Sequence, residues 1–197
     1  MLSAWAALRQ LGALYDLAAL QPPDAAFASR AVALQGRPAW RALHAWCLAD
    51  SSPLTTRLAV AVLEGGEAAD TRALAQALCL ERDGSLQLLA CPGAAGRLAL
   101  RLKTKLHDVS PWRERQPHDA WDAGFLPGTP AGLLALATFQ PRRATLLVAQ
   151  GLGTPALRAT CALLHARQPH FHHAVRLLLV LAEPGLDVGW PVTRVSP

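Results

Sequence analysis

The sequence is poor in charge. Only 17% of its 197 residues are charged, against about 25% in a typical soluble domain, whereas 52% are hydrophobic. A disordered chain is therefore excluded, and we expect extensive burial or an apolar surface that binds a partner. Lys103 and Lys105 are the only lysines and isoleucine is missing, so the net charge of +5 comes almost wholly from arginine. Because a GC-rich bacterial coding bias produces this pattern, arginine alone is weak evidence for nucleic-acid binding.

Long hydrophobic runs are also missing. No apolar run approaches the roughly 18 uncharged residues of a membrane-spanning helix, and the best candidate, Leu177 to Ala182, is too short. The N-terminus has no basic segment before its apolar residues, and Arg9 and Asp16 interrupt them, which argues against a signal peptide. We expect no membrane span and a cytoplasmic location.

Paired cysteines and catalytic motifs are lacking too. Cys47, Cys79, Cys91 and Cys161 form no CxxC pair and are expected to be reduced core thiols. The sequence contains no GxSxG, HExxH or phosphate-loop motif. The stretch "GLGTPA" at 151–156 is rich in glycine, but we expect no strand before it. The sequence therefore predicts a protein that is not an enzyme and has no cofactor.

Helical hairpins are what the sequence predicts instead. Apolar residues recur at three- and four-residue steps after Ser3, Asp24 and Arg37-Pro38, and "GTPA" occurs twice, at 128–131 and 153–156. In each predicted hairpin, the first helix is followed by a break at proline and then by a second apolar run, which ends at glycine. The expected hairpins are 3–36, 37–66, 129–151 and 153–185.

The predicted fold class is accordingly all-α, a single domain over 1–197. Its hairpins stack as in a HEAT-like helical repeat, or pack as a helical bundle. An irregular middle segment covers about 84–128, and an extended tail covers 186–197. Within the middle segment, 97–106 fits both a helix and a small β-hairpin, and the lack of β-branched residues favours the helix.

Four of the seven histidines lie within residues 165–173. His165 is expected at the end of one helix, with His170 and His172 at the start of the next, so the hairpin could bring them together as metal ligands. A solvated helix corner is the simpler interpretation, because adjacent histidines point about 100° apart on a helix and no acidic residue lies near.

A basic segment at 97–115 offers a second alternative. Arg97, Arg101 and Lys105 share one helical stripe and Lys103 lies beside it, which suits a nucleic-acid backbone. A solvated helix face explains the same pattern.

Tryptophan is the strongest indication of a protein partner. Six of the eleven aromatic Trp, Tyr and Phe residues are tryptophan, a residue favoured at interface hot spots. We expect a partner-binding surface formed by the long loop 108–128 and the tail. Its residues are Trp112, Arg113, Arg115, Trp121, Phe125 and Trp190.

Three stretches carry a resemblance: "GRPAWRALHAWCLA", "WDAGFLPGTPAGLLALATF" and "QPHFHHAVRLLLVLA". Together they cover about a quarter of the chain. They resemble a family of uncharacterised small helical proteins encoded with bacterial type VI secretion systems. The resemblance implies an accessory or adaptor role and no catalytic residues. The predicted function is a non-enzymatic protein-binding adaptor or scaffold; the alternatives are a nucleic-acid-binding repeat protein and a His-dependent metal-binding protein.

Overall fold

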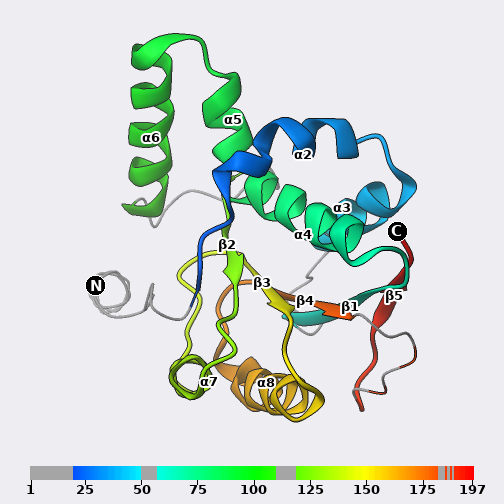
Figure 1. Ribbon diagram of the computed structural model, residues 1–197. Coiled ribbons are helices and arrows are strands. Elements are labelled where there is room, and N and C mark those ends of the chain that lie inside the picture. The colour runs from blue at the N-terminus through cyan, green and yellow to red at the C-terminus, as the bar shows by residue number, and fades with distance from the viewer. Residues whose placement is uncertain (1–19, 50–56, 110–118, 182–184, 186, 188) are drawn as a thin grey trace, which may run out of the picture.

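A five-stranded parallel sheet forms the centre of the molecule. The computed structural model describes residues 20–49, 57–109, 119–181, 185, 187 and 189–197, with only the backbone for residues 101 and 103–109. The strand order is β2-β3-β4-β1-β5, and every neighbouring pair is parallel (Figure 1). The strands are β1 (Leu58–Glu64), β2 (Asp122–Phe125), β3 (Thr145–Gln150), β4 (Val175–Leu181) and β5 (Thr193–Val195).

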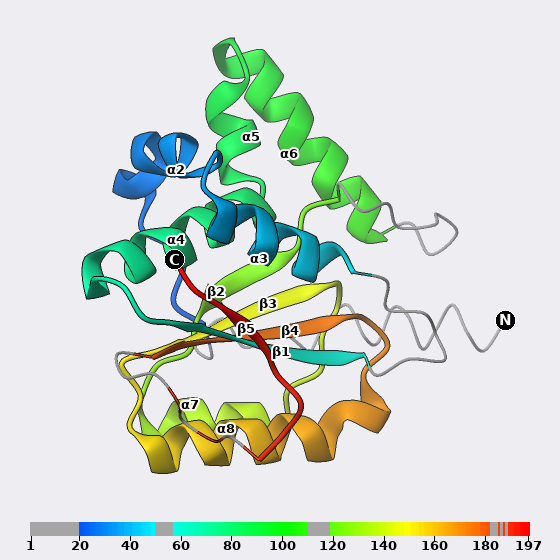
Figure 2. The same ribbon diagram turned by 90° about the vertical axis from the view of Figure 1, so that its right-hand side faces the viewer.

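Helices cover both faces of the sheet, so the molecule has three layers (Figure 2). On one face lie η2 (Ala25–Phe27), α2 (Ala28–Leu34), α3 (Pro38–Leu48) and α4 (Ala68–Arg82). On the other lie α7 (Pro130–Ala137), α8 (Thr154–Arg167) and the short η3 (Gln168–His170). Two further helices, α5 (Ser85–Ala90) and α6 (Gly93–Val109), project beyond the α2–α4 layer.

The core consists of two hydrophobic clusters, one on each face of the sheet. Successive residues of β4 alternate between them: Leu177 and Leu179 pack towards α7 and α8, whereas Leu178 and Val180 pack towards α3 and α4. All seven residues of β4 are buried. A central parallel strand has no solvent face, and therefore its sequence is apolar over Leu177–Leu181, with Arg176 as its one buried charged residue.

The predicted all-α class, with its HEAT-like repeat or bundle, is wrong: the fold is α/β. The error lies in the second half of three predicted hairpins, where the apolar runs form β1, β3 and β4. The runs are six or seven residues long and contain valine, as buried strands do. Helical spacing can always be found in a run that is apolar throughout, so periodicity alone could not separate the two structures.

The repeated pattern is real, but it encodes a helix followed by a strand. The segment 37–66 forms α3 and β1, and the segments 129–151 and 153–185 contain α7–β3 and α8–β4. Proline opens all three helices, as expected. Thr129 caps α7, since its side chain accepts a hydrogen bond from the Gly132 N–H at 3.2 Å. In the second GTPA copy, Gly153 precedes α8, Thr154 is its first residue and Pro155 its second, so Thr154 does not cap this helix.

Several local predictions are confirmed. Asp24 caps the first described helical turn by accepting a hydrogen bond from the Ala26 N–H at 2.9 Å, and Ala31 and Leu34 are buried as expected. Trp40 and Cys47 lie on the buried face of α3. The predicted hairpin over 3–36 begins in residues 1–19, which lie outside the described part of the chain.

The middle segment is more regular than predicted. Gly84, in a left-handed conformation with φ of 82°, separates α4 from α5, and α6 occupies the segment for which the helix was favoured. Residues 122–125, expected within a loop, form edge strand β2. Part of the predicted extended tail forms β5, which pairs with β1 of the same chain.

The direction in which the chain adds strands to the sheet changes at the neighbouring strands β4 and β1. The chain crosses from β1 to the far edge through α4, α5 and α6, and then returns one strand at a time through α7 and α8. At the β2 edge, Gln21 and Phe125 form an antiparallel bridge with two 2.8 Å hydrogen bonds. Gly124 permits this approach, because a Cβ there would lie 2.8 Å from the Gln21 carbonyl oxygen.

Candidate functional site

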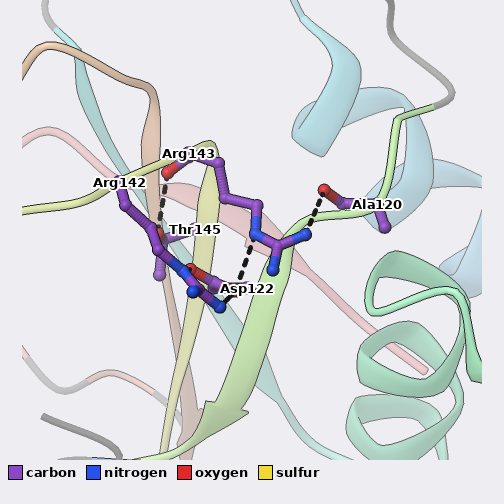
Figure 3. A network of polar contacts seen from close by, with 5 residues as sticks. All are labelled: Ala120, Asp122, Arg142, Arg143 and Thr145. Carbon is purple, nitrogen blue, oxygen red and sulfur yellow. Dashed lines mark hydrogen bonds and ion pairs between the residues drawn. The ribbon is translucent and has the colours of Figure 1, made fainter. Parts of the chain in front are cut away.

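A charged network links the amino ends of β2 and β3 (Figure 3). Asp122, the first residue of β2, has a side chain only 6% exposed and accepts two hydrogen bonds from Arg142, at 2.9 and 3.0 Å. The Nε atom of Arg143 lies 2.8 Å from the same carboxylate. Arg143 also donates to the Ala120 carbonyl at 3.4 Å. Because both carboxylate oxygens contact guanidinium groups, this network fixes the two strand ends and offers no free acid or base.

Trp121 lies beside this network in the core. Its side chain is buried beneath Arg82, the last residue of α4, whose guanidinium lies 5.6 Å from the ring centroid. The Trp121 N–H donates to the Arg82 carbonyl at 2.7 Å. Trp121, one of the predicted partner-binding residues, therefore anchors β2 to the end of α4.

A histidine–glutamate pair joins α3 to α4. The Nε2 atom of His44 lies 3.1 Å from Glu81, and its ring stacks on Trp40 with centroids 4.8 Å apart. Burial lowers the pKa of His44, Arg82 lowers it further, and Glu81 opposes both. Cys47, three residues further along α3, is unreactive, since burial raises the pKa of its thiol to about 12. The pair of His44 and Glu81 therefore holds α3 and α4 together, and the thiol on the same face of α3 is not an activated nucleophile.

The carboxyl edge of the sheet is where parallel α/β folds usually place ligands. Glu64 ends β1 at this edge, next to the reversal in strand order, and its carboxylate accepts hydrogen bonds from Arg194 at 2.6 Å and from the Gly185 N–H at 3.1 Å. The hydrogen bond from Arg194 lowers the pKa of Glu64. These contacts tie the end of β1 to β5 and to the segment before it.

The glycine-rich stretch 151–156 also lies at this edge. It follows β3 directly and opens α8, so the expectation that no strand precedes it is wrong. Gly151 has a φ of 68°, and Gly153 is the residue before the helix. The turn connects strand to helix without contributing an acidic, basic or nucleophilic side chain at residues 151–153.

The predicted histidine ligands do not converge. His165 is exposed in the last turn of α8, with its ring 5.8 Å from that of Trp190, whereas His170 ends η3 and His172 lies between η3 and β4. Among the residues that the structure describes, no three His, Cys, Asp or Glu side chains form a group that could hold a metal ion.

The other predicted partner residues are divided between the core and the surface. Phe125 is buried, whereas Trp190 is half-buried and lines an open hollow of about 500 Å³ against Arg158, Ala159 and Ala162 of α8. Trp112, Arg113 and Arg115 lie outside the described residues. Among the described members of this predicted surface, Phe125 is thus in the core and Trp190 lies beside α8.

The projecting helix α6 presents an exposed apolar surface. Leu98 is 60% exposed and Leu102 is 52% exposed, and Ala95 and Ala99 are exposed beside them. At 100° per residue, these four positions fall within an arc of about 100°, which we call the α6 stripe. The leucine spacing was visible in the sequence, but only the fold shows that nothing described in this chain buries it.

Helix α6 packs on α5 through its opposite side. Among the α6 residues with described side chains, Gly96 and Leu100 are half-buried, and a Cβ on Gly96 would lie 3.8 Å from the Cβ of Cys91. The predicted nucleic-acid residues all belong to α6: Arg97 is exposed, and Arg101, Lys103 and Lys105 lie on its backbone further along. Basic positions therefore accompany the apolar stripe on one helix.

The fold and this surface define an α/β protein with a three-layer parallel-sheet body and a projecting amphipathic helix. No protein-family model, curated protein or solved structure matches the chain. None of the helices in the described part of the chain has the length and apolar character needed to cross a membrane.

Proposed function

We propose that this chain is a non-enzymatic protein-binding adaptor or scaffold. The observation that supports this proposal most directly is the α6 stripe, because Leu98 and Leu102 are more than half exposed on a helix that leaves the body of the protein. Burying each leucine in an interface would stabilise a complex by on the order of 1 to 2 kcal/mol. An accessory role in a bacterial secretion system, implied by the sequence resemblance, is part of the same proposal.

The polar contacts of the body are consistent with this role. The carboxylates of Asp122 and Glu64 and the imidazole of His44 each contact a partner within the chain. These contacts connect strands or helices to one another, which keeps the three-layer body rigid beneath the projecting helices α5 and α6. A rigid body with a projecting contact helix suits a protein that joins others.

The experiment compares affinity-tagged chains in a lysate of the native host. Wild type and Leu134→Gln, a control on α7 where Leu134 is 72% exposed, should retain the same partner. The double variant Leu98→Gln/Leu102→Gln should lose it. The free energies of unfolding of the three proteins should agree within about 0.5 kcal/mol, because the changed side chains are exposed. Identical partner sets for all three chains would contradict the adaptor proposal.

A further inference from the structure

We infer that the partner of α6 is an acidic amphipathic helix of another protein, docked along the α6 stripe. This inference rests on the proposed adaptor function and names the chemistry of its partner.

The size pattern of the stripe suits a helix. Ala95, Leu98, Ala99 and Leu102 alternate small and large side chains along one exposed face. In helix pairs, large side chains of one helix fill the spaces beside small side chains of the other. The sequence continues the same three- and four-residue spacing at positions 106 and 109. Helices that lie in a membrane interface usually add aromatic residues to their apolar face, and α6 contains none.

The charge on α6 selects an acidic partner. Residues 93–109 contain four basic residues, Arg97, Arg101, Lys103 and Lys105, and one acidic residue, Asp108, which gives a formal charge of +3 with histidine neutral. By helical position, Lys103 and Lys105 fall on opposite sides of the stripe. A second copy of α6 would bring like charges together along both sides, whereas glutamates at the flanking positions of a partner helix would pair with them.

The α6 stripe lies on a side of α6 that the described residues leave exposed. A Cβ on Gly96 would lie 3.8 Å from the Cβ of Cys91 at the end of α5, so the α6 stripe lies on the side of α6 that faces away from α5. A helix docked there would extend the α5–α6 pair into a three-helix arrangement. The backbone of the body would not have to move, because the stripe residues are already exposed.

The test uses two fluorescent synthetic peptides with the same leucine and alanine stripe, one flanked by glutamate and one by lysine. Binding to the full chain is measured by fluorescence anisotropy. The glutamate peptide should bind at least about tenfold more tightly than the lysine peptide, and Leu98→Gln/Leu102→Gln should weaken its binding at least about tenfold, as expected for lost interface anchors. Leu134→Gln should bind as wild type does. The variant Lys103→Glu/Lys105→Glu should prefer the lysine peptide.

Three outcomes would overturn the inference: equal binding of the two peptides, binding of neither, or unchanged preference in the lysine-to-glutamate variant. Self-association that Leu98→Gln/Leu102→Gln abolishes would identify a second copy as the occupant. Binding to vesicles containing phosphatidylserine, lost in the same variant while neither peptide binds, would identify a membrane. If the native partner is retained by wild type and lost by the stripe variant while the peptides fail, the adaptor proposal stands and only the acidic-helix inference falls.

Discussion

At the scale of single residues, Asp122 shows how a buried charge is stabilised by its fold. Its carboxylate starts β2, and both guanidinium groups that contact it come from the segment before β3. The residues are 20 and 21 positions apart in the chain. Parallel pairing of β2 with β3 aligns the two strand starts, since Asp122 is in register with Thr145. Nothing in the local sequence identifies this carboxylate as an ion-pair partner.

Replacing Asp122 with asparagine should destabilise the protein by about 3 kcal/mol, because Arg143 would remain nearly buried without its anion. The value is at the lower end of the range for buried pairs, since the Arg142 side chain is 40% exposed. Urea unfolding followed by circular dichroism measures the difference. Asp70→Asn is the matched control, because the Asp70–Arg37 pair is exposed and should contribute less than about 1 kcal/mol. Equal losses in the two variants would refute a structural role for the network.

At the scale of elements, the ion pair of Glu64 and Arg194 connects the end of β1 to β5. The folded-state pKa of Glu64 lies below its ordinary value of 4.5, because the hydrogen bond from Arg194 favours the charged form. A carboxyl group with a lowered pKa stabilises the folded state above the unfolded-state pKa. That contribution disappears as the pH falls through the folded-state pKa.

Glu64→Gln should therefore lower the free energy of unfolding by about 0.5 to 1 kcal/mol at pH 7, a modest value because the Arg194 side chain is 42% exposed. The difference from wild type should decrease below pH 4.5 and vanish once Glu64 is protonated. Urea titrations at several pH values measure it. Arg194→Gln should show the same pH dependence, and a difference that grows as the pH falls would contradict the assigned direction.

At the scale of the whole molecule, the two hydrophobic clusters determine which cysteines react. Cys47 and Cys79 lie on the buried faces of α3 and α4, and Cys161 lies on the buried face of α8. Burial raises the pKa of Cys47 to about 12, that of Cys161 to about 11, and that of Cys79 well above its ordinary value. Cys91 lies outside both clusters and is half-exposed.

The folded protein at pH 8 should consequently react rapidly with an aromatic disulfide reagent at one of its four thiols. The other three should react only upon unfolding, which absorbance of the released thiolate can follow. Cys91→Ser should remove the rapid phase and leave the slow phases unchanged. A second thiol that reacts at the rate of Cys91 in the folded state would show that one of the clusters is open to solvent.

Much of the local structure could be predicted from the sequence by itself. Asp24 and Thr129 cap helices, prolines open α3, α7 and α8, and Gly84 ends the first long helix after β1, because these effects depend on a few consecutive residues. The apolar excess and the buried cysteines were equally evident. Each of these features has a physical cause within about four residues of the chain.

Tertiary structure alone decided which apolar runs became strands and which apolar face remained exposed. The runs in β1, β3 and β4 are buried on both sides only after they pair with one another, and pairing partners such as Leu58 and Val175 are far apart in sequence. Trp121 and Phe125 entered the core for the same reason, whereas Leu98 and Leu102 stayed exposed because α6 turns Gly96 towards the end of α5. Local sequence specifies that a residue is apolar, but the packing of distant elements determines whether it is buried or left to bind a partner.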